Sequence, residues 1–237
     1  MGVPVLPYTA PLRRGTLLRR PNRFVVEVQL DDGETVRAHC PNPGRMTGCS
    51  TPGSPVWLLA RTHTALPYRL EIVQAGSTLV GANPVHANAV VEAALRAGAL
   101  RHFCELGLER REAFLPDHSS RVDFLLRDRA GRALWLEVKS VTLVEDGVAL
   151  FPDAVTARGR RHLLSLAERV LAGDRAVTLY LVQRDDAHSV GPAAHIDLDY
   201  AEAFATARAA GVEMLGLRAR VQPDGITIDR ELPVVIV

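Results

Sequence analysis

Residues 120–139 read SRVDFLLRDRAGRALWLEVK, and this stretch predicts two apolar β-strands joined by a polar, glycine-containing turn. Side chains alternate between the two faces of a strand, so Glu137 and Lys139 share one face of the second strand. The valine between them and the leucine before them face the other way. The hairpin therefore places a carboxylate and an ammonium group side by side on one surface of a sheet.

The length of the turn decides whether Asp123 lies close to Glu137. An odd loop centred on Ala130 pairs the two acidic residues directly, whereas an even loop shifts the register and separates them. Directly opposed β-carbons lie about 5 Å apart, and like charges at that spacing are unfavourable unless a proton or a cation lies between them. Mg²⁺, or Mn²⁺ in its place, suits carboxylate oxygens and retains several waters. The alternative is two strand-edge charges that face water.

The chain contains 27 arginines and a single lysine, Lys139. A lysine kept in so arginine-rich a sequence indicates a need for the compact ammonium group, although chance survival is the simpler alternative. A water activated by the cation beside Lys139 is a suitable nucleophile for a phosphodiester, and the ammonium can stabilise charge in the transition state. Asp123, Glu137 and Lys139 are therefore the candidate catalytic residues.

Two further segments can contribute to this site. Glu112 lies on the preceding predicted strand and could supply a third metal-binding carboxylate, with a solvated strand position as the alternative. Arg158 and His162 lie four residues apart on a predicted helix over residues 154–172, and so share one face. Arg158 suits a phosphate oxygen, and His162 suits phosphate binding or proton transfer. A solvated helix face is the alternative. Asp153 is the expected N-cap of this helix.

The chain divides into two patterns. Four or five short β-prone runs separated by turns fill residues 1–80, which predicts a small barrel of the oligonucleotide-binding kind. Residues 81–237 follow the order helix, three strands, helix, strand and helix, with late strands, which predicts a mixed sheet with helices packed on it. We therefore predict an α/β (α+β) protein of two domains. Its helices are expected over residues 85–97, 154–172 and 200–210.

Composition narrows the class of protein. A hydrophobic content of 47%, with 23% charged residues and a net charge of +1, favours a folded domain over a disordered chain. Continuous apolar runs are too short for a membrane span, the N-terminus lacks a secretory pattern, and three cysteines do not suggest a disulfide framework or zinc site. We expect a cytoplasmic protein without membrane association. The first 80 residues carry nine arginines against five acids, which indicates a phosphate-facing surface or a solvated edge.

Several motifs resemble the sugar fermentation stimulation protein A family of bacteria and archaea. They occur in order along nearly the whole chain: RPNRF (20–24), AHCPNPGRM (38–46), SRVDF (120–124), LEVKSVT (136–142), FPDAVTARGRRHL (151–163) and GVE (211–213). The resemblance implies a barrel like an oligonucleotide-binding fold, followed by a PD-(D/E)XK nuclease-like domain. It also implies a DNA-binding protein linked to the regulation of sugar metabolism, notably of maltose.

On this resemblance, Asp123, Glu137 and Lys139 match the nuclease core, and Arg158 and His162 match the helix motif that follows it. The chain departs from the family pattern in two places. An arginine stands directly before His162, where relatives often have lysine, in line with the arginine bias. The proline–aspartate pair that names the nuclease fold is absent before Asp123, which slightly weakens the metal site.

The predicted barrel supplies the candidate nucleic-acid contacts. Its arginines would bind phosphates, and an exposed Phe24 could stack on a base, with a core position for Phe24 as the alternative. The candidates are Arg20, Arg23, Asn42 and Arg45.

These features favour a DNA-binding protein with a Mg²⁺-dependent phosphodiesterase (nuclease) site, with RNA as a second possible partner. One alternative is a non-catalytic, sequence-independent DNA-binding regulator that retains a nuclease-like fold. Another is an enzyme acting on a small phosphorylated metabolite, although the sequence lacks a glycine-rich phosphate loop for a nucleotide cofactor. Metal-dependent turnover distinguishes the first reading from the second. The sequence does not indicate an oligomeric state.

Overall fold

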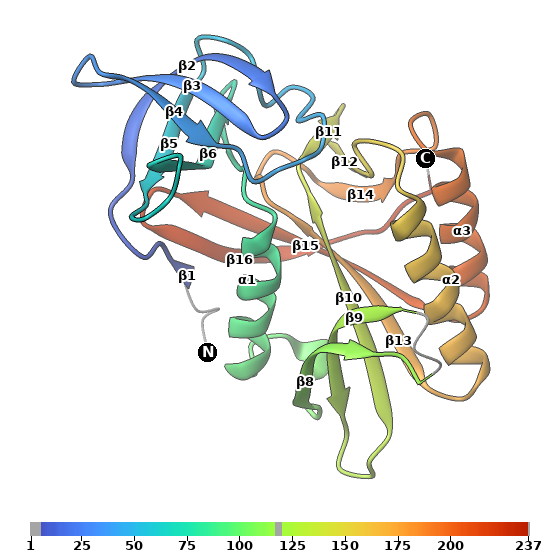
Figure 1. Cartoon of the computed structure of the whole chain (residues 1–237). Helices are drawn as coiled ribbons and strands as arrows, with labels where there is room; N and C mark the ends of the chain where they lie inside the picture. The colour runs from blue at the N-terminus through green and yellow to red at the C-terminus, as the bar shows by residue number, and fades with distance from the viewer. Residues whose placement is uncertain (1–5, 117–119, 237) are drawn as a thin grey trace.

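The structure is a computed structural model that describes residues 6–116 and 120–236. A barrel lies against one end of a long mixed sheet, and helices cover both faces of that sheet (Figure 1). This arrangement confirms the predicted fold class. Within the described residues, the helices are all too short or too polar to cross a membrane.

The barrel is a sheet that closes on itself. Its strands are β2 (Arg13–Asn22), β3 (Val25–Leu30), β4 (Thr35–His39), β5 (Pro55–Ala60), β6 (Tyr68–Ala75) and β7 (Thr78–Gly81). They are ordered β4-β3-β2-β5-β6-β7, and a parallel pairing of β4 with β6 closes the first five into a barrel. The sequence does not predict β2, because arginines at both of its ends interrupt the apolar alternation.

The second sheet runs in the order β1-β16-β15-β13-β10-β9-β8. Its strands are β1 (Leu6–Pro7), β8 (Gly107–Phe114), β9 (Arg121–Arg127), β10 (Ala133–Val141), β13 (Arg175–Val182), β15 (Glu213–Gln222) and β16 (Gly225–Leu232). Strands β10, β13 and β15 are parallel, so their carboxyl ends share one edge of the sheet. The predicted division at residue 80 assigns β1 to the barrel, whereas β1 pairs with β16 in this sheet. Residues 1–5 of that predicted domain lie outside the described residues.

Helices bury the two faces of β10 in different cores. Helix α1 (Val85–Arg96) packs against the face that contains Leu134 and Leu136. Helices α2 (Ala157–Leu171) and α3 (Leu198–Ala209) cover the opposite face, which contains Trp135. A short 3₁₀ helix, η1 (Arg101–Phe103), follows α1. The period-two alternation of β10 thus assigns Glu137 and Lys139 to the side of α2 and α3.

Thr156, rather than Asp153, caps helix α2: its side chain accepts a hydrogen bond from the backbone N–H of Gly159 at 3.1 Å. The prediction for Asp153 is therefore wrong, because the chain stays non-helical for three residues beyond it. Asp153 instead accepts a hydrogen bond from the backbone N–H of Met46 in the barrel, at 3.3 Å. This contact ties the segment before α2 to the barrel.

A small sheet continues from the end of β10 beside the barrel. Its strands are β11 (Leu143–Glu145), β12 (Val148–Phe151) and β14 (Ser189–Pro192). The sequence does not predict them, because runs of three or four residues carry too little periodicity. Strands β11 and β12 of the small sheet connect β10 to the segment that precedes α2.

Candidate active site

The β9–β10 hairpin has the register that brings its two acidic residues together. The connecting residues, 128–132, are centred on Ala130, and the ladder pairs Leu136 with Phe124. The next pair in that register is Asp123 with Glu137. The loop therefore has the odd length that the direct pairing of Asp123 with Glu137 requires.

Asp123 lies where β9 and β10 part. One carboxylate oxygen, Oδ2, accepts a hydrogen bond from the backbone N–H of Val138 at 2.7 Å, and Oδ1 accepts one from Asn88 Nδ2 of α1 at 2.6 Å. Burial, and then the charge of Glu137, raise the pKa of Asp123 to about 6 despite these hydrogen bonds. Two acidic groups therefore repel each other in a place with little solvent to screen them.

Glu137 is 5% exposed and uses only one of its two oxygens for hydrogen bonds. Lys139 Nζ donates to Oε1 at 2.6 Å, and His162 Nδ1 lies 2.5 Å from the same oxygen. Burial acts to raise the pKa of Glu137, but Lys139 and His162 outweigh it and lower the pKa to about 2. Among the described residues, the buried Oε2 has no hydrogen-bond partner. An ionised, buried oxygen without a partner is costly unless it binds something else.

His162 supports Glu137 from helix α2. Its Nε2 accepts a hydrogen bond from Arg158 Nε at 3.3 Å, so its Nδ1 carries the proton and donates to Glu137. The sequence assigns His162 to nucleic-acid contact, but the structure gives it a different role. Because its ring is buried and both nitrogens are engaged, it positions the carboxylate. Arg158 is exposed, and within the described residues its two terminal nitrogens have no hydrogen-bond partner.

The pair of Asp123 and Glu137 fits a divalent cation. The unpartnered Oε2 supplies one anionic ligand, and the repulsion that raises the pKa of Asp123 is the effect that a cation relieves. In the parts of the chain that the structure describes, no group of three or more His, Cys, Asp or Glu side chains converges on one point. A cation held here would complete its coordination with water, as Mg²⁺ commonly does.

Glu112, the predicted third carboxylate, is not brought into this site. Its backbone adopts a left-handed conformation with a φ of 49°, and its side chain is half exposed. There it pairs with Arg121, whose Nε lies 3.0 Å from Oε2 of Glu112. The ion pair holds the carboxylate at the outer surface of the sheet.

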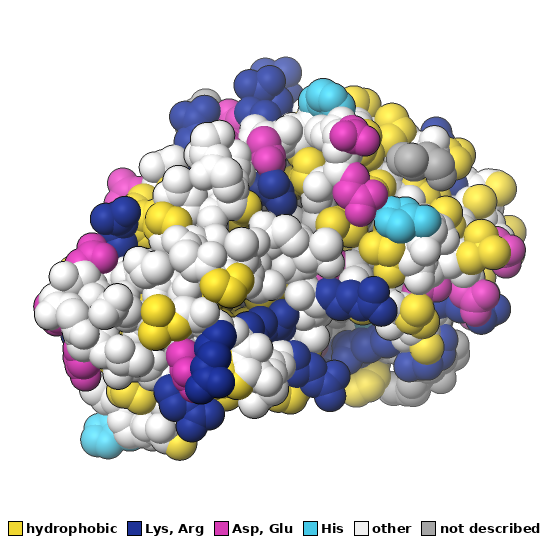
Figure 2. All heavy atoms as spheres, turned by 90° about the horizontal axis from the view of Figure 1, so that it is seen from above, with side chains coloured by type: hydrophobic (Ala, Val, Ile, Leu, Met, Phe, Trp, Pro, Cys, Tyr) yellow, Lys and Arg dark blue, Asp and Glu magenta, His cyan; other side chains and the backbone are white. Residues whose placement is uncertain are grey.

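A cleft of about 440 Å³ opens onto Lys139. One wall is the barrel loop that contains Pro43 and Gly44, and the other is the segment from Phe151 to Thr156 before α2. The carboxyl end of β10 lies between them. Several basic side chains gather in the lower middle of the face shown in Figure 2, between the barrel on the left and the helices on the right. The cleft therefore joins the barrel to Lys139, which is paired with Glu137.

Arg20 has a different role from the one its sequence suggests. Its guanidinium group donates to the backbone carbonyl oxygens of residues 23, 42, 44 and 45, at 2.9–3.0 Å. Those hydrogen bonds hold the loop at residues 42–46 in one shape instead of reaching a phosphate. Asn42 is also buried, and its side-chain oxygen accepts a hydrogen bond from the backbone N–H of Gly44 at 2.8 Å. Both residues build the wall of the cleft from within.

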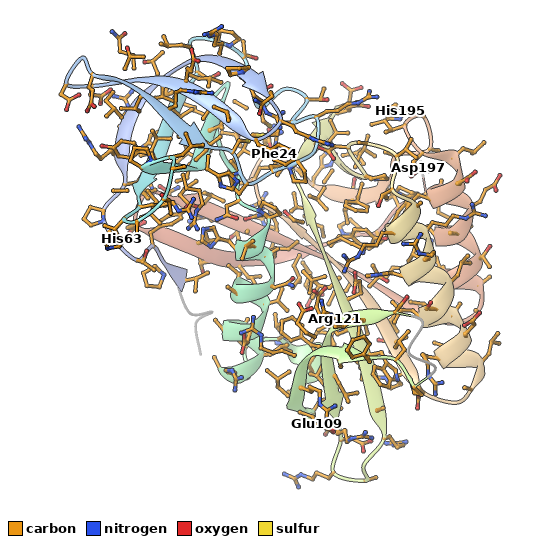
Figure 3. The ribbon with its side chains drawn as sticks, in the orientation of Figure 1. Phe24, His63, Glu109, Arg121, His195 and Asp197 are labelled. Carbon is orange, nitrogen blue, oxygen red and sulfur yellow. The ribbon has the colours of Figure 1, made fainter. Side chains whose placement is uncertain are left out.

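Arg23 and Arg45 are exposed and line a hollow that adjoins the cleft, and Arg23 lines the cleft as well. The predicted alternative for Phe24, a core position, does not hold, since its side chain is 48% exposed. The guanidinium of Arg23 lies 5.0 Å from the centre of the Phe24 ring. In Figure 3, Phe24 lies where the barrel meets the upper end of β10, while Glu109 marks the opposite end of the sheet.

Sequence reasoning missed Asn88, which holds Asp123 through its side-chain amide. The residue lies on a correctly predicted helix, but no spacing in the sequence shows which strand that helix covers. It also missed Asp153 as a link to the barrel, because that contact joins segments more than a hundred residues apart.

Two family models match the chain. The "SfsA N-terminal OB domain" matches residues 18–82, and the "Sugar fermentation stimulation protein RE domain" matches residues 85–225. The chain belongs to the sugar fermentation stimulation protein family. The resemblance inferred from the motifs is therefore confirmed.

Relatives in this family match along almost their full lengths. A sugar fermentation stimulation protein homolog of Geobacter metallireducens is 46% identical over 95% of this chain and 98% of its own. One from Shewanella sp. (strain MR-4) is 41% identical over 96% of this chain and 98% of its own. The solved structure of Pyrococcus furiosus SfsA in complex with Ca²⁺ matches with a TM-score of 0.89 and 25% identity, and covers 100% of both chains. This solved relative thus shares the barrel and the mixed sheet with the present chain.

Proposed function

We propose that this protein is a divalent-metal-dependent phosphodiesterase that cleaves nucleic acid, with DNA as the principal substrate, at Asp123, Glu137 and Lys139. The observation that carries the proposal is the buried, ionised Glu137, whose Oε2 has no partner among the described residues, opposite a second acidic group. A purely structural glutamate at this depth would have both oxygens satisfied.

Asp123 and Glu137 would hold Mg²⁺ or Mn²⁺. Such an ion, when bound, lowers the pKa of a coordinated water and offsets the negative charge of a phosphodiester. The Ca²⁺ in the Pyrococcus furiosus relative supports a divalent cation as the ligand here. Asn88 and His162 fix the orientation of the two carboxylates, so the site is organised before an ion arrives.

Lys139 lines the cleft, and its ammonium is held at 2.6 Å from Glu137. From this position it can donate a hydrogen bond to a phosphate oxygen and stabilise the extra charge of the transition state. The terminal nitrogens of Arg158 are suited to a neighbouring phosphate. Arg23 and Arg45 extend the positive surface along the barrel, where they would bind the backbone of the same strand.

Helix α2 begins at this cleft. Its N-cap, Thr156, lines the cleft, and its first turn reads ARGR. The unpaired N–H groups and the dipole at a helix N-terminus favour an anion, and Arg158 adds to that effect, whereas Arg160 pairs with Asp199. The end of the cleft at Thr156 is therefore suited to phosphate.

The proposal is tested with purified protein, labelled DNA and RNA oligonucleotides and a supercoiled plasmid, with Mg²⁺ or Mn²⁺. We expect cleavage that a chelator stops and that Lys139→Ala abolishes while DNA binding persists. Arg132→Ala, an exposed change on the β9–β10 turn, serves as the control and should cleave normally.

Unchanged cleavage by Lys139→Ala would contradict the assigned role. DNA binding without metal-dependent turnover on any substrate would instead favour the non-catalytic, sequence-independent regulator. Both functions are consistent with a protein that binds DNA in the cytoplasm. In both, the affinity for DNA should fall as the salt concentration rises, because the binding depends on contacts to phosphates.

A further inference from the structure

We propose that the cleft admits one nucleic-acid strand at a time, so that the protein cleaves single strands and unpaired ends in preference to duplex. This inference rests on the proposed function and names the substrate class of the same site. It is carried by the burial of the reacting groups, by the fastened wall of the cleft and by the exposed aromatic ring beside Arg23.

The reacting groups lie too deep for a duplex to reach. Lys139 is 8% exposed and lines the cleft, so a phosphate must enter the cleft to meet it. Glu137, its partner, is 5% exposed. The cleft, of about 440 Å³, is walled by the barrel on one side and the segment before α2 on the other. Double-stranded DNA is stiff over about 150 base pairs, so it does not bend a single backbone into a cleft of this kind. A single strand is flexible enough to thread a phosphate inward.

The wall formed by residues 42–46 is fastened at both sides. Arg20 holds it through three of its backbone carbonyl oxygens and binds a fourth, that of Arg23, beside it. Met46 donates its backbone N–H to Asp153 on the facing segment. Gly44 packs so closely on Asp153 that a β-carbon there would lie 2.2 Å from Oδ2. A wall held in this way does not swing aside to admit a wider substrate.

An exposed aromatic ring next to a cleft residue, Arg23, offers a surface for an unpaired base. The side chain of Phe24 is 48% exposed, and the guanidinium group of Arg23 lies 5.0 Å from the centre of its ring. Arg23 also lines the cleft, so a strand whose phosphate reaches Lys139 passes this pair. Stacking on an aromatic ring needs a base face that is free, and a duplex keeps its base faces stacked on one another.

The inference is tested with one labelled oligonucleotide presented in three forms: as a single strand, as a blunt duplex, and as a duplex with a single-stranded arm. With Mn²⁺ we expect the single strand to be cleaved at least tenfold faster than the duplex, and the armed duplex to be cut within its arm. Equal rates on single strand and blunt duplex would overturn the inference and leave the proposed function standing.

Binding separates failure of the inference from failure of the proposed function. Fluorescence anisotropy with Lys139→Ala should show at least tenfold tighter binding of the single strand than of the duplex. If no form is cleaved by the wild-type protein, the proposed function fails, and the binding ratio alone decides the inference. Equal affinities for the two forms would then overturn it.

Two variants, each with a matched control, test which residues cause the preference for single strands. Phe24→Ala should weaken single-strand binding about tenfold with little change in kcat. Phe114→Ala should not, although Phe114 on β8 is also an exposed ring beside an arginine, because its neighbour Arg121 does not line the cleft as Arg23 does. Equal effects of the two variants would exclude Phe24 as the stacking surface.

Arg20→Ala should lower the ratio of single-strand to duplex cleavage, since it releases the wall at residues 42–46. Arg19→Ala, which removes only an exposed ion pair with Glu27, should leave the ratio unchanged. If Arg20→Ala impairs folding, Arg20→Lys tests the same wall, because it keeps the charge but cannot reach four carbonyl groups. An unchanged ratio in a folded Arg20 variant would show that the wall does not set the preference.

Discussion

Glu71 and Glu137 are both buried on sheet strands, and each lies beside a histidine and a basic side chain. Around Glu71, Arg69 donates to Oε1 at 2.5 Å, while His86 and Asn83 contact Oε2 at 2.8 and 3.1 Å. Burial acts to raise the pKa of Glu71, but His86 and Arg69 outweigh it and lower the pKa. Both oxygens are satisfied, and the cluster fastens the barrel strand β6 to helix α1.

Around Glu137, by contrast, Lys139 and His162 contact the same oxygen, Oε1. The second oxygen has no partner among the described residues, and the charge of Glu137 contributes to the raised pKa of Asp123. Both glutamates have buried charge, so burial alone does not mark a site. The incomplete hydrogen bonding of Glu137 is the difference that points to a ligand.

The largest expected difference between the two clusters is in catalysis. Glu137→Gln should lower the rate of phosphodiester cleavage by about a thousandfold, because an amide lacks the charge to hold a cation. Single-turnover kinetics with saturating Mn²⁺ measure this loss. Full activity in Glu137→Gln would remove the distinction between the two glutamates.

For the free energy of unfolding, we expect the larger effect at Glu71. Glu71→Ala should lower the free energy of unfolding by about 3 kcal/mol, because it leaves two basic partners without their carboxylate. Urea unfolding measures this loss, and the activity per folded molecule should stay near that of the wild type. Glu27→Ala removes an exposed pair with Arg19 and should cost less than about 1 kcal/mol. Similar losses in both variants would contradict the structural role of Glu71.

A divalent cation should stabilise the protein through the second cluster only. Mn²⁺ at a hundred times its dissociation constant should add about 2.7 kcal/mol, which raises the Tm by about 5–10 °C in a chain of this size. Thermal unfolding of Asp123→Asn should show no such rise, whereas Glu112→Gln should retain it. A full shift in Asp123→Asn would place the cation elsewhere.

The smallest expected effect is a pH dependence of stability in chelator. The pKa of Asp123 rises from its usual 3.8 to about 6 in the folded protein. Its protonated form therefore stabilises the fold fully below about pH 4, and this contribution is lost as the pH rises through 6. Between pH 5 and 7, the advantage of Asp123→Asn over the wild type in unfolding free energy should grow by about 1 kcal/mol. A constant gap across that range would contradict the raised pKa.

Local periodicity explains what could be predicted from the sequence. Alternation along β10 and the odd turn fix the shared face of Glu137 and Lys139 and the register with Asp123. Both features depend on residues close together in the chain. The barrel was likewise predictable from turns and short strands, although β2 was hidden by its arginines.

Long-range contacts explain what could not be predicted. Arg20 and His162 look like phosphate contacts, and only the folded chain shows that backbone carbonyls and Glu137 take up their donors. Asn88 reaches Asp123 from a helix whose partner strand the sequence does not specify. Charge and spacing thus locate a site, while tertiary packing decides which of its residues face the substrate.

The single lysine has a practical consequence. Lys139 is the one amine on any side chain, and it lies at the floor of the cleft. A small amine-selective reagent can therefore modify only this residue and the N-terminus. The extent of labelling at Lys139 therefore reports whether the cleft is occupied. Candidate oligonucleotides can be ranked by how strongly each protects Lys139 from the reagent.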